Sequence, residues 1–377
     1  MQLTILRSQL LSGLEKVGRA VNSRSTLPVL AHVFLEACDN RLSFFATDLE
    51  TGIVMPVSAE VKTPGRTTVP AGPFTEYAKT LPTQAELTLT LKDGKLTVKS
   101  GASKASFATG DPGDYPPRPT LAEADHTFTL LPGVLKDLLR QTLPVTATDE
   151  ARAILTGVQF DAAPAQLTLR AADGFRACVA QAGYESLPLA PFQAVVTARS
   201  LREVLRLLDG THPEAVQIIA DQQARVAFLL AEGVIVFAQT LAGEYPDVDQ
   251  VVPKTATTEA VLSVEAFIRA CKQMRVAADK PREALGRLDL QNSGANAVKV
   301  TAEGEILTAS ETTLTGDVTV TGQSMQIALN LAFVLDMLEV IKTSHVRLKA
   351  NAPNTPVVLT PEGVPGLLYV IMPMVGH

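Results

Sequence analysis

Asp48 and Glu50 come nearest to a catalytic pair in this chain. They stand two positions apart in the segment TDLE, within an expected strand, so both side chains would lie on one face. Two carboxylates on one face could act as general acid and general base. The corresponding turns, however, read ADG at Asp173 and AEGE at Glu303. Because these variants keep only the turn-forming character, a turn is the favoured interpretation of TDLE.

No other residue pattern indicates catalysis. The histidines occur singly, without metal-binding spacing: His32, His126, His212, His345 and His377. The sequence lacks the phosphate-binding, dinucleotide-binding and nucleophile-elbow glycine motifs. Cys38, Cys178 and Cys271 are far apart and fit buried free thiols better than a disulfide framework or a zinc site. The sequence therefore predicts no cofactor and no metal, although a site assembled from distant residues would leave no motif.

The composition is typical of a globular protein with several cores. The chain has 377 residues, of which 46% are hydrophobic and 19% charged, and this length suits two or three domains. It has no apolar run of about 18 residues, and its start, MQLTILRSQL, lacks the layout of a signal peptide. We therefore expect a cytoplasmic protein without a membrane partner. The net charge of −6 disfavours a protein coated in nucleic acid but does not describe how charge is distributed.

One pattern occurs three times along the chain. Segments that begin at Thr26, Thr148 and Leu285 each read strand, polar turn, strand, acidic turn, strand. The acidic turns at Asp48, Asp173 and Glu303 are separated by 125 and 130 residues. That spacing suits a repeated domain rather than a solenoid unit.

The flanking segments repeat as well. Each copy is expected to contain a helix, three or four strands, a second helix and about four more strands. The strand connections are short, so antiparallel pairing and an α+β fold follow. The expected domains are 1–124, 125–253 and 254–377. DYPP and EYPD close the first two copies, and Met372-Pro373 is their counterpart in the third.

Basic residues recur on the outer faces of the predicted helices. They are Lys16, Arg19, Lys136, Arg140, Arg199, Arg202, Arg206, Arg269 and Lys272. Lysine and arginine are common on any solvated helix face, which is the simpler explanation. Their recurrence in three copies of an acidic protein instead favours a repeated anionic partner, best matched by a phosphate backbone.

The repeated segments resemble the β sliding clamp family of bacterial DNA polymerase III. The resemblance rests on TLPVLAHV, TDLE, TTVPA, DYPP, AADGFRACV, EYPDV, FVLDML and the terminal YVIMPM, which follow the family's order over nearly the whole chain. It implies a non-catalytic head-to-tail homodimer, whose six domains form a ring around double-stranded DNA in the cytoplasm, at the nucleoid. The implied partners are a clamp loader ATPase, the polymerase III catalytic subunit, and other polymerases and repair proteins with clamp-binding motifs.

The resemblance also implies site residues. A peptide-docking cleft between the second and third domains would use Leu155, Ala172, Gly174, Phe175, Arg176, Ala177, Pro246, Val251, Asn330, Phe333, Val370, Ile371, Met372, Pro373 and Met374. Phe175 and Ala177 stand where the family often has histidine and leucine, so the pocket floor should differ in shape. Arg24 matches a DNA-facing position. Lys104 and Phe107 would meet Val276 and Ala277 of the other subunit at the dimer interface.

Three hypotheses remain open on the sequence. The first is a clamp that encircles DNA, and the second is a repeat-built interaction scaffold that does not bind DNA. The third is an enzyme with a site hidden between domains. A clamp needs a positive inner surface on an acidic protein, which separates the first hypothesis from the second.

Overall fold

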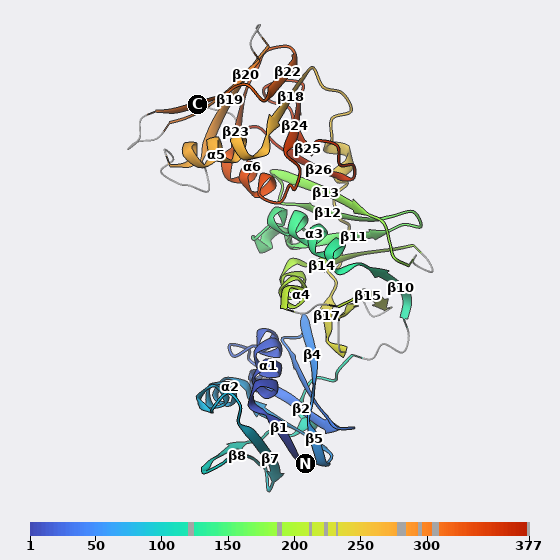
Figure 1. Ribbon diagram of the computed structural model, residues 1–377. Helices are drawn as coiled ribbons and strands as arrows, with labels where there is room; N and C mark the ends of the chain where they lie inside the picture. The colour runs from blue at the N-terminus through green and yellow to red at the C-terminus, as the bar shows by residue number, and fades with distance from the viewer. Residues whose placement is uncertain are drawn as a thin grey trace. The chain divides into compact units, whose positions relative to one another are not determined.

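The computed structural model describes residues 1–119, 124–186, 191–210, 213–221, 225–230, 233–276, 284–292, 296–303 and 309–374. The elements of these residues occur in three copies of one order: a strand, a helix, several strands, a second helix and three strands (Figure 1). The α+β class expected from the sequence is confirmed.

The first copy contains these elements: β1 (Gln2–Leu6), α1 (Arg7–Val17), β2 (His32–Cys38), β3 (Arg41–Thr47), β4 (Thr51–Ser58), β5 (Glu60–Thr63), β6 (Gly65–Pro70), α2 (Ala71–Thr80), β7 (Glu86–Lys92), β8 (Lys95–Ser100) and β9 (Ser103–Ala108). The second contains these: β10 (Ala124–Leu130), α3 (Pro132–Thr142), β11 (Gly157–Ala162), β12 (Leu167–Ala172), β13 (Arg176–Ala182), β14 (Phe192–Thr197), α4 (Ala198–Gly210), β15 (Val216–Asp221), β16 (Arg225–Leu229) and β17 (Ile235–Gln239).

The third copy contains these elements: β18 (Thr258–Ser263), α5 (Val264–Arg275), β19 (Leu285–Gln291), β20 (Ala297–Ala302), β21 (Ser310–Leu314), β22 (Val318–Gly322), β23 (Met325–Asn330), α6 (Leu331–Leu338), β24 (His345–Ala350), β25 (Val357–Pro361) and β26 (Leu367–Ile371). Short 3₁₀ segments join several elements, among them Gly18–Ala20, Leu143–Val145 and Val248–Val251.

The structure corrects two details of the expected order. A strand, not a helix, opens each copy. The sequence did not reveal these strands because segments such as Gln2–Leu6 alternate in burial over only a few positions. Among the described residues, five strands, not three or four, separate the two helices of the first and third copies, and three strands rather than about four follow the second helix of each copy.

The chain folds into two compact units that do not coincide with the copies. One unit is Met1–Pro132, Tyr184–Ala190 and Arg199–Thr240. The other is Gly133–Gly183, Pro191–Ala198 and Leu241–His377. The second copy thus contributes to both units.

Each unit contains a large sheet that combines strands of two copies. In the first unit the order is β10-β15-β16-β17-β4-β3-β2-β6, and in the second it is β14-β11-β12-β13-β26-β25-β24-β18-β22. Each unit also has a smaller sheet, β5-β1-β7-β8-β9 in the first and β21-β20-β19-β23 in the second. The strand pairs of all four sheets are antiparallel, as expected from the short connections.

The two large sheets join their copies in the same way. In the first unit, β4 of the first copy pairs with β17 of the second, with Val54 opposite Ile235. In the second unit, β13 of the second copy pairs with β26 of the third, with Arg176 opposite Ile371. The third strand after the first helix of one copy therefore pairs with the last strand of the next.

The helices pack on these sheets through apolar stripes. Leu10, Leu14 and Val17 of α1 are buried, as the helical spacing predicts. Gly13 lies on the same side, and a Cβ there would stand 2.4 Å from the Phe44 ring, so glycine lets α1 approach the sheet closely. In the described part of the chain, no helix has the length and apolar character needed to cross a membrane.

Candidate functional site

Two of the three acidic turns, at Asp48 and Asp173, are closed by their own side chains, and the residues that follow Glu303 (304–308) lie outside the described residues. Asp48 Oδ1 accepts hydrogen bonds from the backbone N–H groups of Glu50, at 3.1 Å, and Thr51, at 2.7 Å. Asp173 Oδ1 accepts in the same way from Phe175, at 2.9 Å, and Arg176, at 3.0 Å. These bonds confirm that the acidic residue forms the turn, because its acceptor atom is committed to the backbone.

A buried tyrosine holds the strand that ends at each of these turns. Tyr245, in EYPD, accepts a 2.9 Å hydrogen bond from the backbone N–H of Ala172. Tyr115, in DYPP, donates to the His32 carbonyl at 3.2 Å and takes a backbone hydrogen bond from Thr47. The predicted counterpart at Met372 differs, since 41% of this residue is exposed.

Arg176 connects three segments of the second unit. Its Nε donates to Asp173 Oδ2 at 3.0 Å, its Nη1 to Asp336 Oδ2 at 2.8 Å and its Nη2 to the Pro144 carbonyl at 2.6 Å. Its guanidinium also stacks 4.2 Å from the centre of the Phe333 ring. Arg176 is buried, so in this structure the predicted docking residue holds segments of the unit together and presents little surface.

An apolar cluster lies next to this arginine in the second unit. Its buried members are Leu155, Ala172, Ala177, Val179, Val195, Tyr245, Val248, Val358 and Val370. Ala177 and Val370 are opposite each other in the β13–β26 pair, as are Val179 and Leu368. The cluster therefore brings together predicted residues of the second and third copies. It also contains residues that no sequence motif had indicated as docking residues: Val179, Val195, Tyr245, Val248 and Val358.

Exposed apolar side chains occur beside the cluster. The exposed fraction is 65% for Phe175, 47% for Val251, 41% for Met372 and 40% for Met374. The Met372 backbone N–H donates to the Phe175 carbonyl at 2.9 Å, so the terminal segment is bonded to the acidic turn. Such exposed apolar residues next to a hydrophobic cluster are typical of a binding site.

The other predicted docking residues have structural roles in the unit. Ile371 is fully buried in β26, and Asn330 caps α6 by accepting a 2.9 Å hydrogen bond from the Ala332 N–H. Gly174 has a φ of 93°, a left-handed conformation that favours glycine. Pro246 is exposed and Pro373 half-buried. The burial of Ile371 leaves its side chain facing the protein interior rather than the surface.

Three of the predicted basic residues of the first unit, Arg19, Arg199 and Arg206, are paired with carboxylates. Arg199 forms ion pairs with the buried Asp48 and with Glu50, the latter at 3.9 Å. Glu203 lies between two others, within ion-pair distance of both Arg206 and Arg19. Arg24 is exposed and Lys16 half-buried. Burial, and then the charge of Arg206, lowers the pKa of Arg202.

In the second unit the same mixture of charges occurs. Lys272 pairs with Glu339 at 2.8 Å, and Arg269 lies 3.6 Å from Glu265. Arg140 of α3 is exposed and Lys136 half-buried. The expected concentration of basic charge on the helices is therefore offset in both units by acidic partners.

The predicted dimer residues lie at sheet edges or helix ends. Lys104 and Phe107 belong to β9, the edge strand of the five-stranded sheet. The Phe107 ring packs 5.2 Å from Phe74 and 5.7 Å from Tyr77, measured between ring centres. Val276 follows α5 and is 76% exposed. Ala277, like His212 and residues 375–377, lies outside the described residues.

Comparisons with known proteins agree over the whole length. Three family models of the DNA polymerase III beta subunit match this chain. The N-terminal-domain model matches residues 1–120, the central-domain model 129–247 and the C-terminal-domain model 249–375. The Escherichia coli beta sliding clamp is 30% identical, with 99% of this chain and 100% of that protein covered. That of Synechococcus elongatus is 27% identical, with 99% of each chain covered.

Solved structures agree as well. A Bacillus subtilis sliding clamp superposes with a TM-score of 0.94 at 24% identity, and a Pseudomonas aeruginosa clamp bound to griselimycin with 0.91 at 26% identity; both comparisons cover 100% of each chain. Three repeated α+β domains of this kind define a clamp-type protein. The chain belongs to the family of the bacterial DNA polymerase III beta subunit, the β sliding clamp, as its motifs indicated.

Proposed function

We propose that this chain is a DNA sliding clamp, which encircles duplex DNA as a ring and tethers the replicative polymerase. The observation that carries the proposal is the match of all three domains to the beta-subunit models. The proposed domains are 1–124, 125–253 and 254–377. The protein has no catalytic role in this proposal, and it acts in the cytoplasm at the nucleoid, where a loader ATPase opens the ring.

The sheet junctions support a head-to-tail dimer. Two junctions pair the third strand of one copy with the last strand of the next, as β4–β17 and β13–β26. The strands at the equivalent positions of the remaining copies are β21, the third strand of the last copy, and β9, the last strand of the first, and both lie at a sheet edge. Pairing of β21 with β9 of a second chain would repeat the junction twice and close a ring of six domains.

The basic residues of the helices and of the turn at Arg24 support binding to the DNA backbone. Phosphate contacts hold a protein on DNA without carrying sequence information, which a sliding protein requires. Arg24, Arg140 and Arg269 are exposed. Part of the basic charge is already paired with carboxylates of the protein, so fewer cations are available to contact phosphates. We therefore expect DNA affinity to depend only modestly on salt concentration.

The apolar cluster and the exposed residues around it support docking of partner peptides. Met372 and Met374 have flexible side chains that can repack around different sequences. The proposed partners are the polymerase III catalytic subunit, the loader, and other polymerases and repair proteins. The griselimycin complex of the Pseudomonas aeruginosa relative shows that a protein of this family binds a ligand.

Retention on DNA tests the topological mechanism. The clamp is loaded onto nicked circular DNA by a bacterial clamp loader, and the bound fraction is measured before and after the DNA is linearised. The clamp should be lost from linear DNA but retained on the circle, because enclosure holds it. Equal retention on both forms would contradict encirclement.

A matched pair of variants tests the ring. Val276→Arg places a charge at the proposed interface on a residue that is 76% exposed, so folding should be unaffected. This variant should sediment as a monomer and fail to remain on circular DNA. Val364→Arg makes the same change at a residue that is 49% exposed and lies outside the proposed interface. It should remain a dimer, and a dimeric Val276→Arg protein would contradict the proposed junction.

A further inference from the structure

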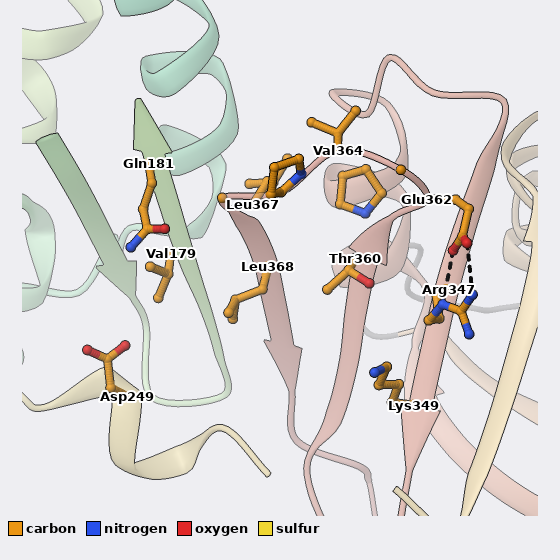
Figure 2. Close-up of a pocket in the computed structure, with 14 residues that line it drawn as sticks. Val179, Gln181, Asp249, Arg347, Lys349, Thr360, Glu362, Val364, Leu367 and Leu368 are labelled. Atoms are coloured by element: carbon orange, nitrogen blue, oxygen red, sulfur yellow. Dashed lines mark hydrogen bonds and ion pairs between the residues drawn. The ribbon is translucent and has the colours of Figure 1, made fainter. Parts of the chain in front are cut away.

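A groove lies on the same sheet face as the apolar cluster. It has a volume of about 590 Å³ and is lined by β13, β24, β25, β26, the β25–β26 hairpin and Asp249. None of its lining residues belongs to the predicted docking set. Figure 2 shows Val179 and Gln181 on β13, with Leu368 on the neighbouring strand, and Thr360 and Lys349 beyond it.

The groove is continuous with the apolar cluster. Val179 belongs to both, and Leu368 packs against the cluster while lining the groove. In the β13–β26 ladder, the pair Val179–Leu368 follows the cluster pair Ala177–Val370 two residues further along. Two strand residues span about 7 Å. An extended peptide bound over Ala177 and Val370 would therefore reach the groove with two or three more residues.

The charges that line the groove are largely paired within the protein. Arg347 donates to both carboxylate oxygens of Glu362, at 3.0 and 2.8 Å, and to Glu259 at 2.7 Å. The dashed lines in Figure 2 mark the bonds to Glu362. Asp249 accepts from Arg170 at 2.9 Å. Arg347 and Asp249 thus have their charges balanced before any ligand arrives.

Lys349 is less fully paired. Its Nζ lies 3.5 Å from Glu259, longer than a normal charged hydrogen bond, and 41% of its side chain is exposed. Thr360 on the neighbouring strand β25 and Leu368 on the next strand, β26, are half-buried, and Val364 is 49% exposed on the hairpin. The groove thus combines apolar residues on β13 and β26 with an ammonium group on β24, which suits an aliphatic side chain followed by a carboxylate.

We propose that this groove is an additional docking subsite for the segment that flanks the docking motif in a partner protein. An aliphatic side chain of that segment packs on Val179 and Leu368, and an adjacent carboxylate pairs with Lys349. This inference rests on the proposed docking function of the apolar cluster. It adds a specificity element that selects partners by the residues outside the motif itself.

Peptide binding measured by fluorescence anisotropy tests the subsite. The core probe is a fluorescein-labelled peptide Leu-Asn-Leu-Phe, whose apolar side chains suit the cluster. Two longer probes add four residues with one leucine and one aspartate, at the amino end or at the carboxyl end. One of the longer probes should bind about tenfold more tightly than the core probe, because its added leucine becomes buried and its added aspartate forms one ion pair.

Three variants separate the groove from the cluster. Thr360→Trp fills the groove and should remove the gain of the longer probe, and Lys349→Gln should remove part of it. Replacing aspartate by asparagine in the probe should match the effect of Lys349→Gln. Both variants should bind the core probe within about twofold of the unchanged protein. Lys254→Gln, the same change at an exposed lysine outside the groove, should keep the full gain.

The outcomes distinguish this inference from the proposed function. If the core probe binds and neither longer probe gains affinity, or if the gain persists in Thr360→Trp, the subsite is wrong and the docking function stands. If the core probe does not bind, the docking function fails and the subsite fails with it. A thermal melt of each variant identifies loss of folding, and Lys349→Gln tests the groove even if Thr360→Trp unfolds.

Discussion

The Met372 backbone N–H donates a 2.9 Å hydrogen bond to the carbonyl oxygen of Phe175. This bond joins the residue that follows the last strand to the turn that Asp173 closes, about two hundred positions earlier in the chain. It continues the β13–β26 ladder by one bond beyond the Arg176–Ile371 pair. The exposed side chains of Phe175 and Met372 are therefore positioned by the backbone.

Because the backbone makes this bond, the methionine side chains can be removed without detaching the segment. The double variant Met372→Ala and Met374→Ala should bind the core probe at least tenfold more weakly, since it loses two apolar contact surfaces. Its melting temperature should change little. Leu27→Ala, at a residue that is 48% exposed in the other unit, is the matched control and should bind normally. Unchanged binding by the double variant would contradict the placement of the site.

Arg176 should matter for stability as well as for binding. Arg176→Met removes three hydrogen bonds and leaves Asp173 without its ion pair, which should lower the free energy of unfolding by about 2–4 kcal/mol. Calorimetry of the intact chain measures the shift. Arg287→Met breaks an exposed pair with Glu303 and should cost less than about 1 kcal/mol. Equal effects of the two substitutions would argue against Arg176 as a support.

The ion pairs around Arg347 should make stability depend on acidity. Hydrogen bonds from Arg347 hold the pKa values of Glu259 and Glu362 below their ordinary value of 4.5. Carboxyls with lowered pKa values stabilise the folded state above pH 4.5 and lose that contribution as the pH falls through the folded-state pKa. The difference in melting temperature between the unchanged protein and Arg347→Met should therefore be constant near neutral pH and shrink below pH 4.5. A difference that grows in acid would contradict this.

The cysteines should differ in reactivity. Cys38 is exposed, whereas Cys178 and Cys271 are buried. Burial raises the pKa of Cys271 to about 12 and also raises that of Cys178, so little thiolate forms at either. Mass spectrometry after brief iodoacetamide treatment of the folded protein should find the label on Cys38 alone. After unfolding, all three should react. Label on Cys178 in the folded protein would show that β13 opens locally.

The sequence predicted most of the fold because the pattern occurs three times. Alternating strands, the acidic turns and the apolar helical stripes each depend on neighbouring residues, and their repetition distinguished signal from chance. The opening strands were missed because five residues such as Gln2–Leu6 carry little periodic signal. The division into two units was missed because it depends on which strands pair across copies, as β4 and β17 do.

The candidate site was less predictable. Motif matches selected Leu155, Ala177 and Val370, which the structure brings into one cluster. They did not show that the Arg176 side chain bonds to Asp336, 160 residues away, or that Ile371 is buried. The ion pairs of Arg199 with Asp48 and of Lys272 with Glu339 were equally hidden, because partners so far apart in sequence leave no local pattern.

The junctions between copies are made by peptide groups, which every amino acid except proline carries in full. The N–H and C=O groups of β13 and β26 can therefore continue to bond whichever side chains the two strands carry. A substitution to proline within either strand is the exception, since it deletes a donor. Backbone hydrogen bonds thus hold the copies together, whereas side chains would select a partner. Substitutions that change partner specificity can therefore leave the junction between the copies intact.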